Sequence, residues 1–173
     1  GAIAAHASEL CGNPTTAKGY CIKSWACEWA GAKNRAETIK WTLKWIESGM
    51  CYPGMDPWHY PGCTVKQSRE YEAYQRLGKA FEGEYMFEEA FSSYKKAFAA
   101  RPDAYNLVVS ITKVLSKMNR LDDAIELART APCNDPLAKN IRRDVIKELK
   151  EKKARGYVYK PRKKPATDEP LEG

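Results

Sequence analysis

The sequence lacks most of the motifs that enzymes and cofactor-binding proteins use. It has two histidines, His6 and His59, among its 173 residues. It contains no C-x-x-C pair, no C-x-x-C-H haem-attachment segment, no phosphate-binding glycine loop and no G-x-S-x-G nucleophile turn. The adjacent acids Glu88 and Glu89 would not face one site on a helix, so they do not form a catalytic pair. We therefore expect no enzyme activity, no metal and no cofactor.

Long apolar runs are also missing. No segment approaches the ~20 consecutive apolar residues that a membrane-spanning helix needs. We therefore do not expect a transmembrane protein. The chain is 43% hydrophobic and 29% charged, as in a globular protein. Its length fits one domain with a single core.

Six cysteines are present, and their distribution is uneven. Five lie between Cys11 and Cys63, these two included, and Cys133 stands alone. This clustering favours disulfides and therefore an oxidising organellar compartment, such as the thylakoid lumen or the mitochondrial intermembrane space. Reduced thiols that pack as small apolar side chains are the alternative.

Hydrophobic periodicity is helical along most of the chain, so we predict an all-α fold. A first helix is expected to begin at "NPTT", with Asn13 as the N-cap and Pro14 in the first turn. A second follows "GAKN", where Asn34 and Glu37 have the spacing of a capping box, and Gly49 ends it. Its apolar face is expected to contain Ile39, Leu43 and Ile46.

Residues 71–104 alternate small and bulky side chains in a fixed order. The small residues let two antiparallel helices approach closely, and a proline stops the second helix. The small residues and the proline are Gly78, Ala90, Ala97 and Pro102, and the bulky ones are Tyr74, Leu77, Phe81, Phe87 and Tyr94. This order resembles the tetratricopeptide repeat, a 34-residue helical hairpin.

A second, degenerate unit follows with the period of that repeat. Ala124, Ala131 and Pro136 each lie one such period after a signature position of the first unit. The unit departs from the repeat pattern at Val108, Thr112 and Ala128. After Pro136, a four-residue apolar spacing indicates a terminal capping helix, with Ile141, Val145 and Leu149 on its apolar face.

These patterns predict a solenoid of helical hairpins with a disulfide-stapled N-terminal third and an extended basic C-terminal tail. Four regions are expected: a cysteine-rich hairpin and loop (1–68), two repeats (69–136), a capping helix (137–155) and the tail (156–173).

The resemblance implies a function in protein binding. Solenoids bind partners on the concave surface formed by the first helix of each hairpin. The corresponding positions here are Glu72, Gln75, Lys79, Glu82, Asn106, Val109, Lys113 and Ser116. We expect a non-catalytic interaction or scaffold subunit, working as an accessory or assembly component of a large organellar complex of a respiratory or photosynthetic membrane.

The segment "CYPGMDPWHYPGC", residues 51–63, is rich in turn formers. Gly54 and Gly62 each follow a proline, which is typical of type II turns. We predict two tight turns closed into a ring by a disulfide between Cys51 and Cys63.

The same loop has no core of its own. At least one of Tyr52, Trp58 and Tyr60 is therefore expected to cover the first hairpin or an adjoining subunit. The alternative is a zinc site formed by Cys27, Cys51, His59 and Cys63.

Positive charge gathers at the C-terminal end. Residues 142–164 contain 11 Lys or Arg and 3 Asp or Glu, and the whole chain has a net charge of +7. Such a segment can contact nucleic-acid phosphates, anionic lipid or an acidic protein surface, or it can remain solvated. The expected contact residues are Tyr157, Tyr159, Lys160 and Arg162. The alternative function is therefore a nucleic-acid- or ribosome-associated accessory protein.

Overall fold

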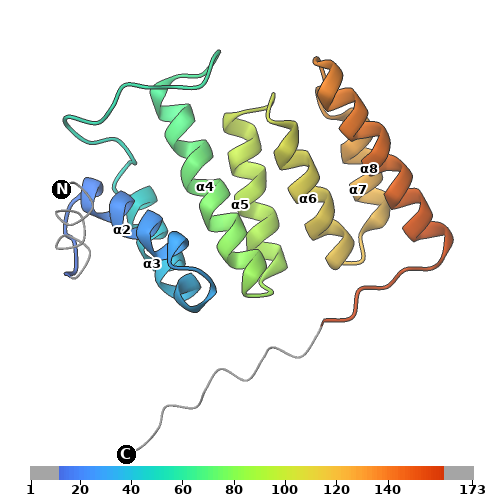
Figure 1. Ribbon diagram of the computed structural model, residues 1–173, viewed down its shortest axis with the longest axis horizontal. Helices are drawn as coiled ribbons and strands as arrows, with labels where there is room; N and C mark the ends of the chain where they lie inside the picture. The colour runs from blue at the N-terminus through green and yellow to red at the C-terminus, as the bar shows by residue number, and fades with distance from the viewer. Residues whose placement is uncertain (1–11, 162–173) are drawn as a thin grey trace, which may run out of the picture.

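The computed structural model describes residues 12–161, and this part of the chain is all-α, without strands. Each α-helix packs mainly against the helices before and after it, so the helices form one row from α2 to α8 (Figure 1). No helix of the described residues is long and apolar enough to cross a membrane. The elements are α2 (Ala17–Trp29), the short 3₁₀ helix η1 (Ala32–Asn34), α3 (Arg35–Glu47), α4 (Val65–Gly83), α5 (Phe87–Ala100), α6 (Tyr105–Lys117), α7 (Leu121–Thr130) and α8 (Pro136–Ala154).

The hairpins α4–α5 and α6–α7 have equivalent helix boundaries at their internal turns, whereas their outer ends differ. α4 ends at Gly83 and α6 at Lys117, while α5 begins at Phe87 and α7 at Leu121. The offset between the two hairpins is the same at both boundaries, and it equals the period seen in the sequence.

The turns within these two hairpins also match. Tyr85 and Asn119, which are separated by the same period, have φ of 61° and 59°, a left-handed conformation that is uncommon outside glycine. The backbone N–H one residue later closes each turn: Met86 donates to the Phe81 carbonyl (3.0 Å) and Arg120 to that of Leu115 (2.8 Å). The repetition therefore extends to the hydrogen bonds of the backbone.

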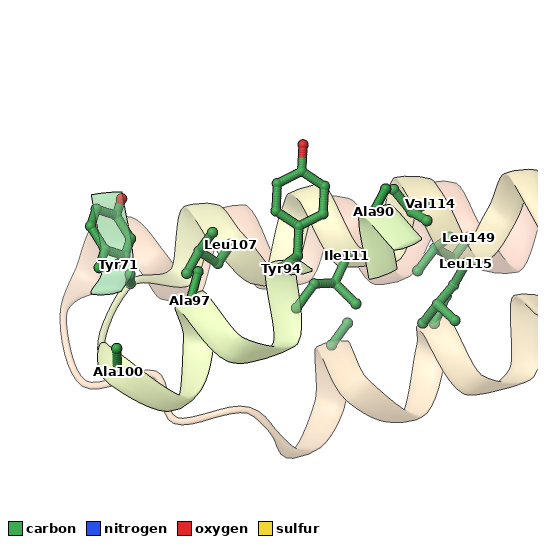
Figure 2. Packing of buried hydrophobic residues seen from close by; sticks show 13 residues of the cluster. Tyr71, Ala90, Tyr94, Ala97, Ala100, Leu107, Ile111, Val114, Leu115 and Leu149 are labelled. Carbon is green, nitrogen blue, oxygen red and sulfur yellow. The ribbon is translucent and has the colours of Figure 1, made fainter. Parts of the chain in front are cut away.

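Small residues lie where the helices of the α4–α5 hairpin approach each other. Ala90 and Ala97 on α5 are fully buried in the main core, beside Tyr94 (Figure 2). Gly78 on α4 packs against the Tyr94 ring, and a Cβ at this position would lie 2.7 Å from two of the ring carbons. The predicted packing role of the small residues is confirmed at these positions.

Enlarging one of these residues should destabilise the protein. Ala90→Leu is expected to lower the free energy of unfolding by about 1–3 kcal/mol, because the added methylenes have no space in this core. Ala99→Leu is the matched control, since Ala99 is exposed on the same helix. Urea unfolding followed by circular dichroism measures both, and equal stabilities of the two variants would contradict this packing.

The first helix begins later than predicted. α2 starts at Ala17, and Thr16 rather than Asn13 is its N-cap: the Thr16 hydroxyl accepts a hydrogen bond from the Gly19 N–H (3.1 Å). Pro14 lies before the helix instead of in its first turn. The physical reason is that the threonine side chain satisfies a backbone donor that would otherwise have no partner.

The prediction for α3 was correct in position and only partly correct in its buried face: Ile46 packs against the core and Ile39 is half-buried. Asn34 is the N-cap but its side chain makes no cap hydrogen bond. The capping box does not form, since the Asn34 N–H donates to the Gly31 carbonyl (3.0 Å) and Glu37 accepts from the indole of Trp41 (2.8 Å). Leu43 is 41% exposed. The buried face consists of Thr38, Trp41, Thr42 and Trp45.

The loop between α3 and α4 forms the predicted turns. Gly54 and Gly62 have φ of 74° and 76°. Backbone hydrogen bonds join Met55 to Tyr52 (3.2 Å) and Cys63 to Tyr60 (3.0 Å), as expected for turns centred on the Pro-Gly pairs. The local turn chemistry is confirmed.

The structure does not support the disulfide staple. Cys51 and Cys63 are free thiols, as are Cys21, Cys27 and Cys133, while Cys11 lies outside the described residues. The loop is an open connection from the end of α3 to the start of α4 (Figure 1). The two cysteines have different surroundings: Cys51 is exposed, whereas the Cys63 sulfur lies 3.9 Å from the Ala100 carbonyl at the end of α5.

The first residues of the predicted tail are extended but packed on the fold. The Tyr159 N–H donates to the Asn119 side chain in the α6–α7 turn (2.8 Å), and the Tyr159 ring meets Phe87 edge-on at 5.6 Å. This segment therefore connects the end of α8 to the turns of both hairpins. Residues 162–173, including Arg162, lie outside the described residues.

Candidate functional site

A cavity of about 260 Å³ lies between the loop, the first hairpin and α4. It is lined by Cys21, Trp45, Tyr52, Met55, Asp56, Trp58, Arg69 and Glu72. Two residues that the sequence assigned to separate binding surfaces meet here: Trp58 from the loop and Glu72 from the predicted groove. We call this space the loop cavity.

Arg69 anchors the loop on α4. Its side chain donates to the Asp56 and Trp58 carbonyls (3.1 and 3.0 Å) and pairs with the Glu72 carboxylate at 2.7 Å. The residue is only 9% exposed, and its Nε has no hydrogen-bond partner in the described structure. Burial alone would lower the pKa of the Arg69 guanidinium. The hydrogen bond and charge of Glu72, together with Cys21 and Tyr52, outweigh burial, so the pKa is raised. Arg69 therefore stays charged and fixes the loop.

The thiol in this cavity has little nucleophilic character. Burial raises the pKa of Cys21, and the nearby Arg76 only partly offsets this effect. The thiol therefore stays protonated near neutral pH, which is the unreactive form.

An aromatic row leads from the loop to α4 and consists of Trp58, Tyr60 and Tyr71. The Trp58 ring meets Tyr60 edge-on at 4.6 Å, and Tyr60 meets Tyr71 edge-on at 5.1 Å. The Arg101 guanidinium lies 3.9 Å from the centre of the Tyr60 ring. Trp58 is 49% exposed, so the row ends in a tryptophan that a partner can contact.

Two contacts connect α4 and α6 along the predicted groove. At the N-terminal end of α6, the Asn106 amide donates to the Tyr71 hydroxyl (3.2 Å). Near the C-terminal ends, the Lys117 ammonium donates to Glu82 (2.8 Å), which also accepts from the Tyr94 hydroxyl (3.0 Å). Glu82 and Asn106 therefore hold the two hairpins together in addition to lying on the predicted surface.

The other residues of the predicted groove differ in how exposed their side chains are. Lys79 and Lys113 are exposed, whereas Gln75 and Val109 are half-buried. Ser116 is buried, and its hydroxyl donates to the Thr112 carbonyl (2.8 Å). It is therefore not available to a partner, which corrects the prediction for this residue.

The predicted tail contacts are mostly used within the fold. Tyr157 and Tyr159 are half-buried, and the Lys152 ammonium lies 5.5 Å from the centre of the Tyr157 ring. Lys160 is exposed. The two tyrosines therefore pack against the protein rather than standing free for stacking.

The sequence reasoning missed the arginines that build this region. Arg76 on α4 contacts α2 through Glu28 (3.0 Å) and the Ser24 hydroxyl (2.8 Å). Arg69 and Arg76 have the same helical spacing as the buried Ala73 and Ala80, so they share the face of α4 that packs on the first hairpin. This shared spacing in the sequence could have indicated that Arg69 and Arg76 lie on the buried face of α4.

The alternative zinc site does not form in the described residues. No three His, Cys, Asp or Glu side chains there come together as metal ligands, so Cys27, Cys51, His59 and Cys63 are not gathered at one point.

No protein-family model matches the chain, and the search of curated proteins gives no match.

Proposed function

We propose that the chain is a non-catalytic scaffold subunit that binds another protein at the loop cavity and the adjoining aromatic row. The observation that carries this proposal is that the half-exposed Trp58 of the loop and Glu72 of α4 line the same cavity. A cavity of about 260 Å³ is large enough to take a side chain of a partner.

The architecture supports this proposal. Two hairpins with equivalent internal turns, followed by a terminal helix, are typical of a tetratricopeptide-type solenoid. Solenoids of this type present the first helix of each hairpin to a partner. α4 and α6 are those helices here, and α4 lines the loop cavity.

The residue types support it as well. Trp, Tyr and Arg dominate the few positions that carry most of the binding energy in protein interfaces. Trp58, Tyr60, Tyr71 and Arg101 are of these types and lie in contact with one another. Their mutual packing also fixes them before a partner arrives, which lowers the entropic cost of binding.

The setting that we propose is a large organellar complex of a respiratory or photosynthetic membrane, in which the chain is an accessory or assembly component. The support is in the sequence alone: five cysteines cluster between Cys11 and Cys63, which is typical of an oxidising compartment such as the thylakoid lumen or the intermembrane space, although Cys21, Cys27, Cys51 and Cys63 are free thiols in the structure. We propose no catalytic residue and no cofactor.

Replacing Trp58 should weaken partner binding. Loss of a central tryptophan costs at least ~2 kcal/mol in a typical interface, so Trp58→Ala should reduce affinity by more than about 10-fold. The partner is first identified as the protein that co-purifies with the tagged full chain from its native source. Its affinity for the variant is then measured by calorimetry.

Trp29→Ala is the matched control, because Trp29 is a tryptophan that is 78% exposed on α2, outside the loop cavity. It should leave the affinity unchanged. If Trp29→Ala abolished binding while Trp58→Ala did not, the partner site would lie on α2 and the proposal would be wrong.

A further inference from the structure

A positively charged surface of the described residues lies on α8, ahead of the predicted tail. Exposed cations follow one another along this helix at spacings of four, four and three residues: Lys139, Arg143, Lys147 and Lys150. At 100° per residue they occupy an arc of roughly 80° on the helix. We call this set the basic stripe.

The cations of the stripe are largely free of protein partners. Lys139, Lys147 and Lys150 form no ion pair within the described residues. Arg143 pairs only with the neighbouring Asp144, at 3.2 Å, and both side chains are more than two-thirds exposed. Such an exposed pair contributes little and is readily exchanged for another anion.

Acidic residues keep to a different side of the same helix. Asp144, Glu148 and Glu151 recur at spacings of four and three residues, and Glu148 is held by Lys152 at 2.7 Å. The charges of α8 are therefore segregated except at the exposed Arg143–Asp144 pair, so the field of the basic stripe is only partly cancelled.

We propose that the basic stripe binds the phosphate backbone of double-stranded nucleic acid without reading its sequence. The stripe spans ~16 Å of helix, and one strand of a duplex presents roughly five phosphates over that length. No aromatic side chain lies among the stripe residues, so the contact is with phosphates rather than with stacked bases.

A membrane surface fits the stripe less well. An interfacial helix needs an exposed apolar face to enter the lipid. In α8 the apolar face packs inward: Leu149 is buried, and Ile141 and Val145 lie against the core. Only Leu137, at the start of the helix, is a strongly exposed large apolar residue of α8.

An acidic protein also fits less well. Specific protein interfaces have an apolar centre surrounded by polar residues. The stripe contains no large apolar side chain at its centre. Evenly spaced cations can instead pair with the evenly spaced phosphates of a duplex.

The test uses the full chain and a fluorescein-labelled 20-base-pair DNA duplex, with binding measured by fluorescence anisotropy at several salt concentrations. Four phosphate contacts predict that log K falls with log[salt] with a slope of about −3 to −4. Lys147→Gln/Lys150→Gln should reduce the magnitude of that slope by about 2 and weaken binding to duplexes of different sequence equally.

Lys95→Gln/Lys96→Gln is the matched control, because it removes the same charge from exposed positions on α5. It should leave the slope within about 0.5 of the wild-type value, and circular dichroism confirms the helix content of both variants. Equal slope changes in the two variants would show a general charge effect and overturn the proposal. An unchanged slope in the stripe variant would do the same, as would tighter binding to phosphatidylserine vesicles or polyglutamate than to the duplex.

Discussion

Trp45→Ala is expected to destabilise the protein by about 3–5 kcal/mol, the cost of removing a fully buried tryptophan. Trp45 is 1% exposed and packs with Met50 and Ala73 where α3 meets α4. Its indole N–H donates to the Met50 carbonyl (3.1 Å), which the variant would leave without this partner. The loss should also deform the loop cavity, because Trp45 forms part of its wall.

Urea unfolding of the full chain, followed by circular dichroism, measures this effect. Trp29→Ala is again the control: Trp29 is largely exposed, so its removal should change stability by no more than about 0.5 kcal/mol. Similar losses in the two variants would show that the first hairpin does not pack on α4 as described.

Tyr94→Ala should have an effect of similar size, about 3–5 kcal/mol, but for a different reason. The Tyr94 ring fills the space that Gly78 leaves on α4, and its hydroxyl donates to Glu82, which also holds Lys117 of α6. Tyr94 thus connects α5 to α4 directly and, through Glu82, to α6 of the next hairpin. Its removal should loosen two helix contacts at once.

Tyr94→Phe separates the two contributions. The ring stays and only the hydrogen bond is lost, so the expected cost is about 1 kcal/mol. If the phenylalanine variant were as unstable as the alanine variant in the same urea experiment, the hydroxyl rather than the close packing on Gly78 would dominate. That result would contradict the role of the small residues.

The packing of α4 to α7 was predictable because its determinants are local and periodic. Gly78, Ala90 and Ala97 are small where two helices must touch, and small buried residues recur at the same spacing at Ala124 and Ala131. The sequence therefore contains both the contact and its period. The matching helix ends and turns follow from the same spacing.

The first hairpin was less predictable because large aromatic residues override simple periodicity. The aliphatic spacing Ile39, Leu43 and Ile46 pointed to one face of α3. Trp41 and Trp45 have more area to bury, and they turn a different face inward.

The candidate site was only partly predictable, because its anchors are distant in sequence. The turns at Gly54 and Gly62 follow from local chemistry, but the position of the loop depends on Arg69, which binds carbonyls 11 and 13 residues earlier. An arginine in a helix ordinarily indicates a solvated face. Only the packing of α4 on the first hairpin shows that Arg69 is buried.

Lysine cross-linking of the native assembly, read by mass spectrometry, tests the scaffold proposal most directly. Lys66 is one turn from the loop cavity on α4, and Lys79 and Lys113 are exposed on α4 and α6. We predict that cross-links to a protein partner start from these three lysines. Partner cross-links confined to Lys40 on α3 and Lys95 on α5, with none from Lys66, Lys79 or Lys113, would contradict it.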